Sequence, residues 1–233
     1  MKKWVYFFEE GNADMKALLG GKGANLAEMK RIGLPVPNGF TITTEACNAY
    51  YETGKSLGED VKSQIFDYLK KLEGITGKSF GSKTNPLLVS VRSGSVFSMP
   101  GMMDTILNLG LNDETVEGLA ELTENPRFAY DSYRRFIQMF SDVVLKVAKY
   151  NFEHALEAAK RSNGLTYDTE LTVDQLKALV KTYKDIVQKE TRKPFPQEPE
   201  LQLIMAVNSV FESWDNPRAH IYRNLNDIAH NLG

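Results

Sequence analysis

The sequence predicts an α+β fold with an inserted, all-helical subdomain. Short runs rich in β-branched and aromatic residues alternate with helical patterns from residue 1 to about residue 112. From about residue 113 to residue 193, apolar residues recur only at helical spacing. A proline-rich segment, Pro194–Pro199, then separates this block from a last amphipathic pattern. With 233 residues, 42% of them hydrophobic, the chain can bury one large core or two small ones.

Four segments of the first part are predicted to be strands. Each is rich in β-branched or aromatic residues, or is bounded by glycine and proline. The first follows two lysines, but its apolar run is only about five residues long and acid follows directly, so it is too short for a signal peptide. The predicted strands are Val5–Phe8, Phe40–Thr43, Leu87–Arg92 and Thr105–Leu109.

Helical patterns lie between these strands. One runs from about Lys22 to Arg31 and stops before Gly33, since glycine suits the left-handed residue that follows a helix. Another begins after Thr44, which we expect to be its N-cap. A third covers about residues 59 to 72.

The central block is predicted to hold three long helices. The first carries apolar residues at helical spacing over some five turns, from Phe128 to Val147. The second ends at Gly164, and the third opens with a capping box at Thr172–Gln175. No strand pattern interrupts the block, which therefore predicts an inserted helical subdomain.

The last part of the chain is predicted to return to the first. Three prolines in the segment Pro194–Pro199 favour an extended path. A helix follows from Leu201 to Trp214, and a turn at Asp215–Arg218 leads into the final helix. The predicted domains are therefore residues 1–112 (an α+β lobe), 113–197 (the helical subdomain) and 198–233 (helices that rejoin the lobe).

Composition and charge exclude several classes of protein. The formal net charge of −2 gives no electrostatic reason to expect nucleic acid or an anionic membrane as a partner. No run approaches the ~18 apolar residues of a membrane span. The one cysteine, Cys47, excludes an intrachain disulfide and indicates a reducing compartment, and its helical context predicts an inert apolar side chain. The scattered histidines, His154, His220 and His230, do not predict a metal site.

The first candidate site is Gly20-Gly21-Lys22-Gly23 at the start of a helix. Glycines let backbone N–H groups approach an anion closely, the helix directs its positive end there, and Lys22 adds a mobile charge. The pattern is not a Walker A loop, because Lys16 and Gly23 occupy positions where that motif needs glycine and Ser or Thr. A plain loop with an exposed lysine remains the alternative.

Two further candidates lie around the last two predicted strands. Arg92 ends an apolar strand, where a forked, always-charged donor suits phosphate oxygens; the alternative is an arginine that faces water or pairs with an acid. The run Ser98–Thr105 holds a Pro-Gly turn followed by Met102 and Met103. It is either a loop that closes over a ligand or a turn whose methionines fill the core.

The fourth candidate is the segment Tyr130–Phe136. Asp131 and Arg135 are four residues apart on a predicted helix, so a surface ion pair worth about 0.3–0.5 kcal/mol is one interpretation. The other directs one arginine of the Arg134-Arg135 pair to a phosphate or a partner surface.

Six segments resemble, in order along the whole chain, those of the pyruvate phosphate dikinase family. The run Ser-Met-Pro-Gly-Met-Met-Asp-Thr at Ser98–Thr105 is the most specific, and it favours the dikinase over phosphoenolpyruvate synthase. The matching segments are Gly20–Met29, Val36–Ala46, Leu88–Gly94, Ser98–Gly110, Pro126–Phe136 and Ser213–Ala219.

The resemblance implies a fold and a reaction. The fold is the first lobe of an ATP-grasp-like nucleotide-binding domain. The reaction converts ATP, phosphate and pyruvate to AMP, pyrophosphate and phosphoenolpyruvate through a phosphohistidine on a separate domain. The resemblance also implies Mg²⁺ with ATP, a cytoplasmic location and a homodimer.

The resemblance assigns roles to residues of this chain. Lys22 and Arg92 match catalytic, phosphate-binding positions, and Gly21 lies beside Lys22. Gly101, Met103 and Thr105 lie in the family's loop over the phosphates. Arg135 matches an arginine near the phosphates or near the surface on which the histidine domain docks.

One segment departs from the family pattern, and much of the family's machinery is expected elsewhere. Ser95-Val96-Phe97 stand where the family has small residues and an arginine. The second ATP-grasp lobe, with the adenine pocket and acidic metal ligands, the phospho-accepting histidine and the pyruvate site are expected outside this chain. We therefore expect a part of a longer enzyme that is inactive by itself. The alternative is a non-catalytic module that binds a partner domain through its helical subdomain.

Overall fold

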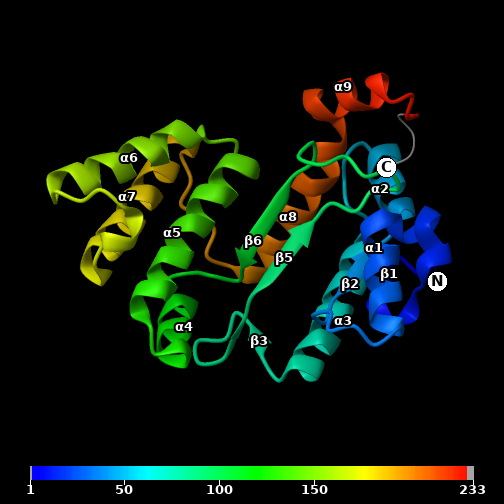
Figure 1. The fold of residues 1–233 in the computed structure, drawn as a ribbon, viewed down its shortest axis with the longest axis horizontal. Helices are drawn as coiled ribbons and strands as arrows, with labels where there is room; N and C mark the ends of the chain where they lie inside the picture. Colours follow the sequence, from blue (N-terminus) through cyan, green and yellow to red (C-terminus); the bar gives the residue numbers. More distant parts are fainter. Residues whose placement is uncertain (1, 230–233) are drawn as a thin grey trace. The chain divides into compact units, whose positions relative to one another are not determined.

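The computed structural model describes residues 2–229, which fold into two compact units (Figure 1). Unit 1 comprises residues 1–77, 92–105 and 207–233, and unit 2 comprises residues 78–91 and 106–206. Within the described residues, helices predominate and the strands form three two-stranded sheets, so the fold is a mixture of helices and small sheets, compatible with the predicted α+β class. The three predicted domains, with boundaries at 112/113 and 197/198, stay a prediction.

Unit 1 is built around an antiparallel pair of strands. The pair joins β1 to β2 with Val5 opposite Ile42 and Phe7 opposite Phe40. Helices α1 and α3 pack against these strands, and α2 packs on α1. The elements of unit 1, with those that it shares with unit 2, are β1 (Val5–Phe7), α1 (Lys16–Arg31), β2 (Phe40–Ile42), α2 (Thr44–Glu52), α3 (Glu59–Thr76), β5 (Val89–Arg92), β6 (Thr105–Leu109), α8 (Pro199–Glu212), the 3₁₀ helix η4 (Ser213–Asp215) and α9 (Pro217–Leu225).

One predicted helix start in unit 1 is wrong, and another is only part of the observed helix. Helix α1 begins at Lys16, but its backbone is not helical at Gly20, so the part of the helix after this kink begins close to the predicted start at about Lys22. The N-cap of α2 is Thr43 rather than Thr44, since the Thr43 hydroxyl accepts from the N–H of Ala46. Thr44 instead donates to the carbonyl of Ala17 at 2.6 Å. Adjacent threonines offer the same capping group, and the tertiary contact to α1 decides between them.

Unit 2 is a helical assembly with short strands beside it. Helix α5 packs mainly against α4 and α7, and α6 packs against α7 (Figure 1). Most aromatic residues of α5 face this core, where Tyr133, Phe136 and Phe140 are fully buried, whereas Phe128 is exposed. The remaining elements of unit 2 are β3 (Ser79–Phe80), β4 (Pro86–Leu87), α4 (Thr115–Thr123), α5 (Pro126–Val143), α6 (Lys149–Ser162) and α7 (Val173–Thr191).

The predicted capping box of α7 is confirmed. Thr172 Oγ1 accepts from the N–H of Gln175 at 3.3 Å, and Gln175 Oε1 accepts from the N–H of Thr172 at 2.9 Å. The predicted strand Leu87–Arg92 is instead two strands, β4 and β5, separated at Leu88. Strand β3 was not predicted, and it pairs in parallel with β4.

The proline-rich segment is extended only in part. Residues 193–198 are not helical, but Pro199 opens α8, so the predicted linker is one residue too long. Proline fits the first turn of a helix because the N–H that it lacks has no partner there.

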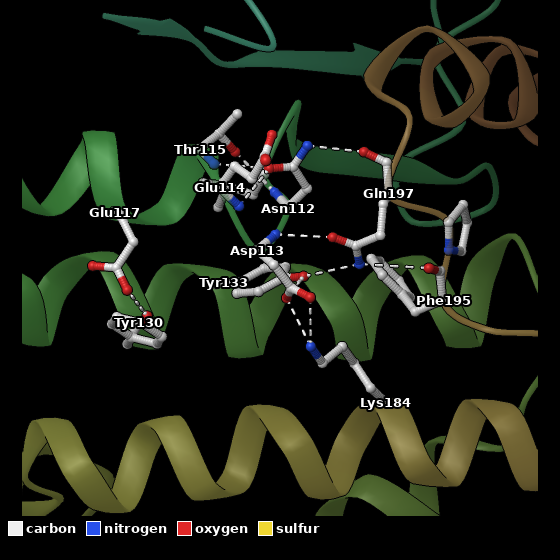
Figure 2. Close-up of polar contacts among 12 residues, drawn as sticks. Asn112, Asp113, Glu114, Thr115, Glu117, Tyr130, Tyr133, Lys184, Phe195 and Gln197 are labelled. Carbon is white, nitrogen blue, oxygen red and sulfur yellow. Dashed lines mark hydrogen bonds and ion pairs between the residues drawn. The ribbon is translucent and has the colours of Figure 1, made fainter. Parts of the chain in front are cut away.

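A polar network holds this linker on unit 2 (Figure 2). The side chain of Gln197 accepts from the N–H of Asp113 at 2.9 Å, and its backbone carbonyl accepts from Asn112 Nδ2 at 2.8 Å. The Asp113 carboxylate accepts in turn from Tyr133 at 2.9 Å and pairs with Lys184 at 2.7 Å. The network therefore joins the linker to the start of α4, to α5 and to α7. No helix within residues 2–229 has the length and apolar character needed to span a bilayer.

Candidate functional site

The glycine-rich segment of α1 lies directly on the loop that follows β5, within unit 1. Gly20 has φ +70° and ψ 171°, a conformation reserved for glycine, and a Cβ at this position would lie 1.4 Å from the carbonyl oxygen of Gly94. The N–H of Gly21 donates to the carbonyl of Ser95 at 2.9 Å. The helix after the kink therefore starts against residues 94 and 95.

Lys22 extends along the same loop. Its Nζ donates to the carbonyl of Ser93 at 2.8 Å, one residue after Arg92. An ammonium has three N–H donors, so two remain for an anion. The sequence indicated the lysine but not this contact, because a backbone carbonyl has no signature in a sequence.

Lys22 and Arg92 are two cations close enough to affect each other. The pKa of Lys22 is lowered, first by partial burial of the ammonium and then by the nearby positive charge of Arg92. Within residues 2–229, neither Lys22 nor the exposed Arg92 forms an ion pair with a carboxylate. Two cations held close together without an acid repel each other, and an anion between them relieves that repulsion.

The glycines are explained largely by close packing. Besides Gly20 against Gly94, a Cβ on Gly23 would lie 2.8 Å from the hydroxyl and 2.9 Å from the methyl group of Thr41. The N–H of Gly21 is bonded to Ser95. The glycines thus bring Lys22 to the loop after β5, rather than offering all their N–H groups to a ligand.

The loop Ser98–Thr105 in the same unit has an open tip. Gly101 has φ +74° and open space where a Cβ would stand, so its backbone conformation, rather than crowding, is what favours glycine there. Met99 is buried and its carbonyl accepts from the N–H of Met102 at 3.2 Å, while Met103 is half-buried. One methionine of the loop therefore fills the core, and the turn itself is exposed at Pro100 and Gly101.

The base of this loop is held by the last part of the chain. The N–H of Asp104 donates to Ser213 Oγ at 3.2 Å, and the Asp104 carboxylate accepts from Asn216 Nδ2 at 3.4 Å. Arg218 lies 3.8 Å from the same carboxylate, and Tyr222 donates to the carbonyl of Ser98 at 3.4 Å. The sequence predicted none of these contacts. The only indication that the two segments belong together was that Ser98–Gly110 and Ser213–Ala219 both resemble the family. Thr105 follows Asp104 directly and begins β6.

The segment Ser95-Val96-Phe97, which departs from the family pattern, makes backbone contacts in this region. The contact to Gly21 uses the Ser95 carbonyl, which any residue supplies. The Ser95 hydroxyl donates to the carbonyl of Phe97 at 2.5 Å. An arginine at one of these positions would have added a cation, and here Lys22 and Arg92 supply the positive charge.

The two arginines of α5, in unit 2, differ completely in environment. Arg135 is 62% exposed and pairs with Asp131 at 2.9 Å, so the predicted pair four residues apart is present. Arg134 is 3% exposed, donates twice to Asp131 and lies 3.5 Å from Asp168. Its neighbourhood is a buried charge network, so Arg134 and Arg135 do not form a two-arginine surface.

The other titratable candidates are Cys47 and the histidines. Cys47 is 5% exposed in α2, and burial raises the pKa of its thiol to about 12, as an inert side chain requires. His154 is exposed, and His220 lies 3.4 Å from Asp215; His230 lies outside the described residues. Within residues 2–229, no three His, Cys, Asp or Glu side chains gather as metal ligands.

The chain matches known proteins over its whole length. The family model described as "Pyruvate phosphate dikinase, AMP/ATP-binding domain" matches residues 16–74 and 54–232. Pyruvate, phosphate dikinase of Clostridium symbiosum is 58% identical over 234 residues, covering 100% of this chain and 27% of that protein. The enzymes so named in Giardia intestinalis and Rhizobium meliloti are 54% and 50% identical, covering 98% and 100% of this chain.

These relatives are much longer than the chain. It spans 27% of the Giardia intestinalis protein and 26% of the Rhizobium meliloti protein. The family model covers most of the chain, including Lys22, Arg92 and the loop Ser98–Thr105. The chain belongs to the pyruvate phosphate dikinase family and corresponds to its AMP/ATP-binding domain.

Proposed function

We propose that this chain supplies the phosphate-binding part of the ATP site of a pyruvate phosphate dikinase. The complete reaction converts ATP, phosphate and pyruvate to AMP, pyrophosphate and phosphoenolpyruvate. The proposal rests on the pair of cations Lys22 and Arg92. Within residues 2–229, neither forms an ion pair with a carboxylate, and the charge of Arg92 lowers the pKa of Lys22. The negatively charged phosphate oxygens of ATP would offset such a pair.

The proposed roles follow from the chemistry of phosphoryl transfer. Because little covalent chemistry falls to the protein, catalysis depends on positioning and on stabilising charge around the transferred group. Lys22 and Arg92 would neutralise phosphate oxygens. Gly101 and Met103 would line the phosphates with backbone groups and Thr105 with its hydroxyl, and the open tip at Gly101 suits close approach to a ligand. Gly21, whose N–H is bonded to Ser95, would hold Lys22 beside them.

Magnesium is proposed to enter as part of the ATP complex. The residues around Lys22 and Arg92 present cations rather than a set of carboxylates, and no metal-ligand cluster occurs within residues 2–229. Hard cations such as Mg²⁺ prefer carboxylate and phosphate oxygens. The acidic ligands are therefore proposed to come from a second ATP-grasp lobe.

Further partners are proposed from the family. They are inorganic phosphate, a phosphohistidine domain of the same longer protein and a second copy of that protein in a cytoplasmic homodimer. The ATP-grasp-like first lobe is proposed for residues 1–112, completed by residues 198–233, with residues 113–197 as the helical subdomain. Arg135, whose side chain is exposed and pairs with Asp131, is proposed to contact the histidine domain or the phosphates.

A chimera tests the function. This chain would replace the matching segment of the Clostridium symbiosum enzyme, which is 58% identical to it. The chimera is expected to form AMP from ATP, phosphate and pyruvate. Lys22→Ala or Arg92→Ala in the chimera should lower kcat by about 10²–10³, the usual cost of losing one charge-stabilising donor. Lys70→Ala, at an exposed lysine of α3, is the control and should leave the rate unchanged.

The chain alone is expected to bind ATP weakly and to turn nothing over. Calorimetry with MgATP should detect no micromolar binding, and incubation with ATP and phosphate should yield no AMP. A chimera that forms AMP equally fast with and without Lys22 and Arg92 would contradict the proposed roles. Micromolar binding of ATP to the chain alone would contradict the division of the site between two lobes.

A further inference from the structure

We infer that Asp104 is a positioning residue for the phosphate loop Ser98–Thr105, acting through Ser213 and Asn216. The inference rests on the proposed function, because it assigns a role within the same site. Asp104 itself is 14% exposed at its side chain and lies at the end of the loop next to β6. It would not touch phosphate; it would fix the loop that does.

The backbone of Asp104 is held by an unambiguous hydrogen bond. Ser213 is 1% exposed, and its hydroxyl donates to the carbonyl of Val210 at 2.6 Å. Because a hydroxyl has a single proton, the Ser213 oxygen can only accept from the N–H of Asp104, which lies 3.2 Å away. The base of the loop is thereby fixed to the end of α8.

The carboxylate of Asp104 is held by the segment that follows Ser213. One oxygen accepts from Asn216 Nδ2 at 3.4 Å, and the other lies 3.8 Å from Arg218. Arg218 stands in the first turn of α9, where the helix dipole disfavours a cation, so a nearby carboxylate offsets that disadvantage. Three residues of one short segment thus converge on a single residue of the loop.

The loop is therefore fixed at its base and open at its tip. No heavy atom beyond the chain neighbours lies within 4 Å of the Cβ position of Gly101, while Asp104, three residues on, is held by side chain and backbone. If the base were released, the tip would sample more conformations, and the ordering of the loop on a phosphate would become less favourable. Asp104 would thus act on phosphate binding without contacting the phosphate.

Amide chemical shifts measured on this chain with inorganic tripolyphosphate test the inference. In the native chain, titration should shift the amide signals of four residues. Gly21 and Gly23 lie beside Lys22, and Gly101 and Met103 lie in the loop. Asp104→Ala should reduce the loop shifts by about fivefold, as expected for the loss of one hydrogen-bonded anchor, and leave those of Gly21 and Gly23 in place. Asp104→Asn retains the acceptor for Asn216 and should restore most of the loop response.

Two further variants separate positioning from a general loss of structure. Ser213→Ala removes the acceptor of the Asp104 N–H and should reproduce the loss at Gly101 and Met103. Asp215→Asn is the matched control, because Asp215 lies in the same segment but pairs with Lys55 and His220 instead. The inference would be overturned if the amide signals of Gly101 and Met103 shifted as much in Asp104→Ala as in the native chain. It would also be overturned if the signals of Gly21 and Gly23 lost their shifts to the same extent.

Failure of the proposed function gives a different result. If the native chain showed no shift at any of the four amides, phosphate binding itself would be refuted. The role of Asp104 in fixing the loop is then tested without ligand, by the rates of amide hydrogen exchange at Met102 and Met103. Exchange that is about fivefold faster in Asp104→Ala would support this role, and unchanged exchange would overturn it.

Discussion

At the scale of single residues, Gly20 is the position where the backbone allows no substitute. Its φ of +70° with ψ of 171° belongs to a region that side chains exclude, and the carbonyl of Gly94 fills the place of a Cβ. This close approach puts the helix that carries Lys22 against the strand end that carries Arg92. The conformation of one glycine therefore sets the spacing of two charges.

Gly20→Ala is expected to destabilise the chain strongly. The conformational strain costs about 1–3 kcal/mol, and displacement of the Gly94 carbonyl adds to it. Gly77→Ala is the matched control, because Gly77 ends α3 with φ +67° but has nothing within 4 Å of its Cβ position. Its cost should be about 1 kcal/mol. Urea unfolding of both variants measures the difference, and equal costs would show that contact with Gly94 is unimportant.

Cys47 is expected to make stability depend on pH above neutrality. Burial raises the pKa of the folded thiol from 9.0 to about 12. The unfolded thiol therefore loses its proton first, so this contribution is complete below pH 9 and falls as the pH rises toward 12. The loss is at most about 1.4 kcal/mol per pH unit.

The variant Cys47→Ala isolates this contribution. Between pH 8 and pH 10, the free energy of unfolding of the native chain should fall by about 1 kcal/mol more than that of the variant, because only the native chain carries the thiol. Urea titrations at both pH values measure it. Parallel losses in the two proteins would mean that the thiol ionises equally in both states.

At the scale of elements, α5 shows how one helix gives neighbouring arginines opposite roles. Arg134 faces the core beside Asp131 and Asp168, whereas Arg135 is turned outward by the helical rotation of about 100° per residue. The sequence predicted the ion pair of Arg135. It could not predict the burial of Arg134, because that depends on the 3₁₀ turn at Asp168, a residue distant in sequence.

Alanine substitutions at the two arginines should differ severalfold in effect. Arg134→Ala removes both hydrogen bonds that the largely buried Asp131 Oδ1 accepts and is expected to cost about 3–5 kcal/mol. Arg135→Ala removes an exposed cation, while Asp131 keeps its hydrogen bonds to Arg134, so this change should cost less than about 0.5 kcal/mol. Chemical denaturation of the two variants is the measurement. A cost for Arg135→Ala as large as that for Arg134→Ala would place Arg135 in the folded core network instead.

At the scale of the whole chain, ligand binding and stability are coupled. A ligand that binds only the folded state raises the free energy of unfolding by RT ln(1 + [L]/Kd). With an affinity near 1 mM, 10 mM inorganic tripolyphosphate should add about 1.4 kcal/mol. Lys22→Gln should abolish most of this gain, and the exposed control Lys70→Gln should retain it.

The measurement is the thermal midpoint with and without tripolyphosphate at constant ionic strength. Ionic strength must be held constant because added salt screens exposed charges and would change stability by itself. A gain that is equal in Lys22→Gln and in the native chain would show that tripolyphosphate binds elsewhere.

Much of the fold could be predicted from local sequence. The four predicted strands fall on β1, β2, the run from β4 to β5, and β6, and the helical block is present from α4 to α7. The capping box of Thr172 was predicted correctly because both of its partners lie within one turn. The N-cap of α2 and the end of the proline-rich linker were each wrong by one residue. Thr43 and Thr44 offer the same capping hydroxyl, and proline fits both an extended segment and the first turn of a helix.

The sequence by itself determined the helical block, the approximate positions of most strands and the family. Each of these depends on local periodicity or on a contiguous motif such as Ser98–Gly110. The tertiary structure alone decided that Lys22 reaches the carbonyl of Ser93, that Arg134 is buried, and that Ser213 and Asn216 hold Asp104. Those contacts join residues far apart in the chain, several of them through backbone atoms, which every residue has and no sequence pattern marks.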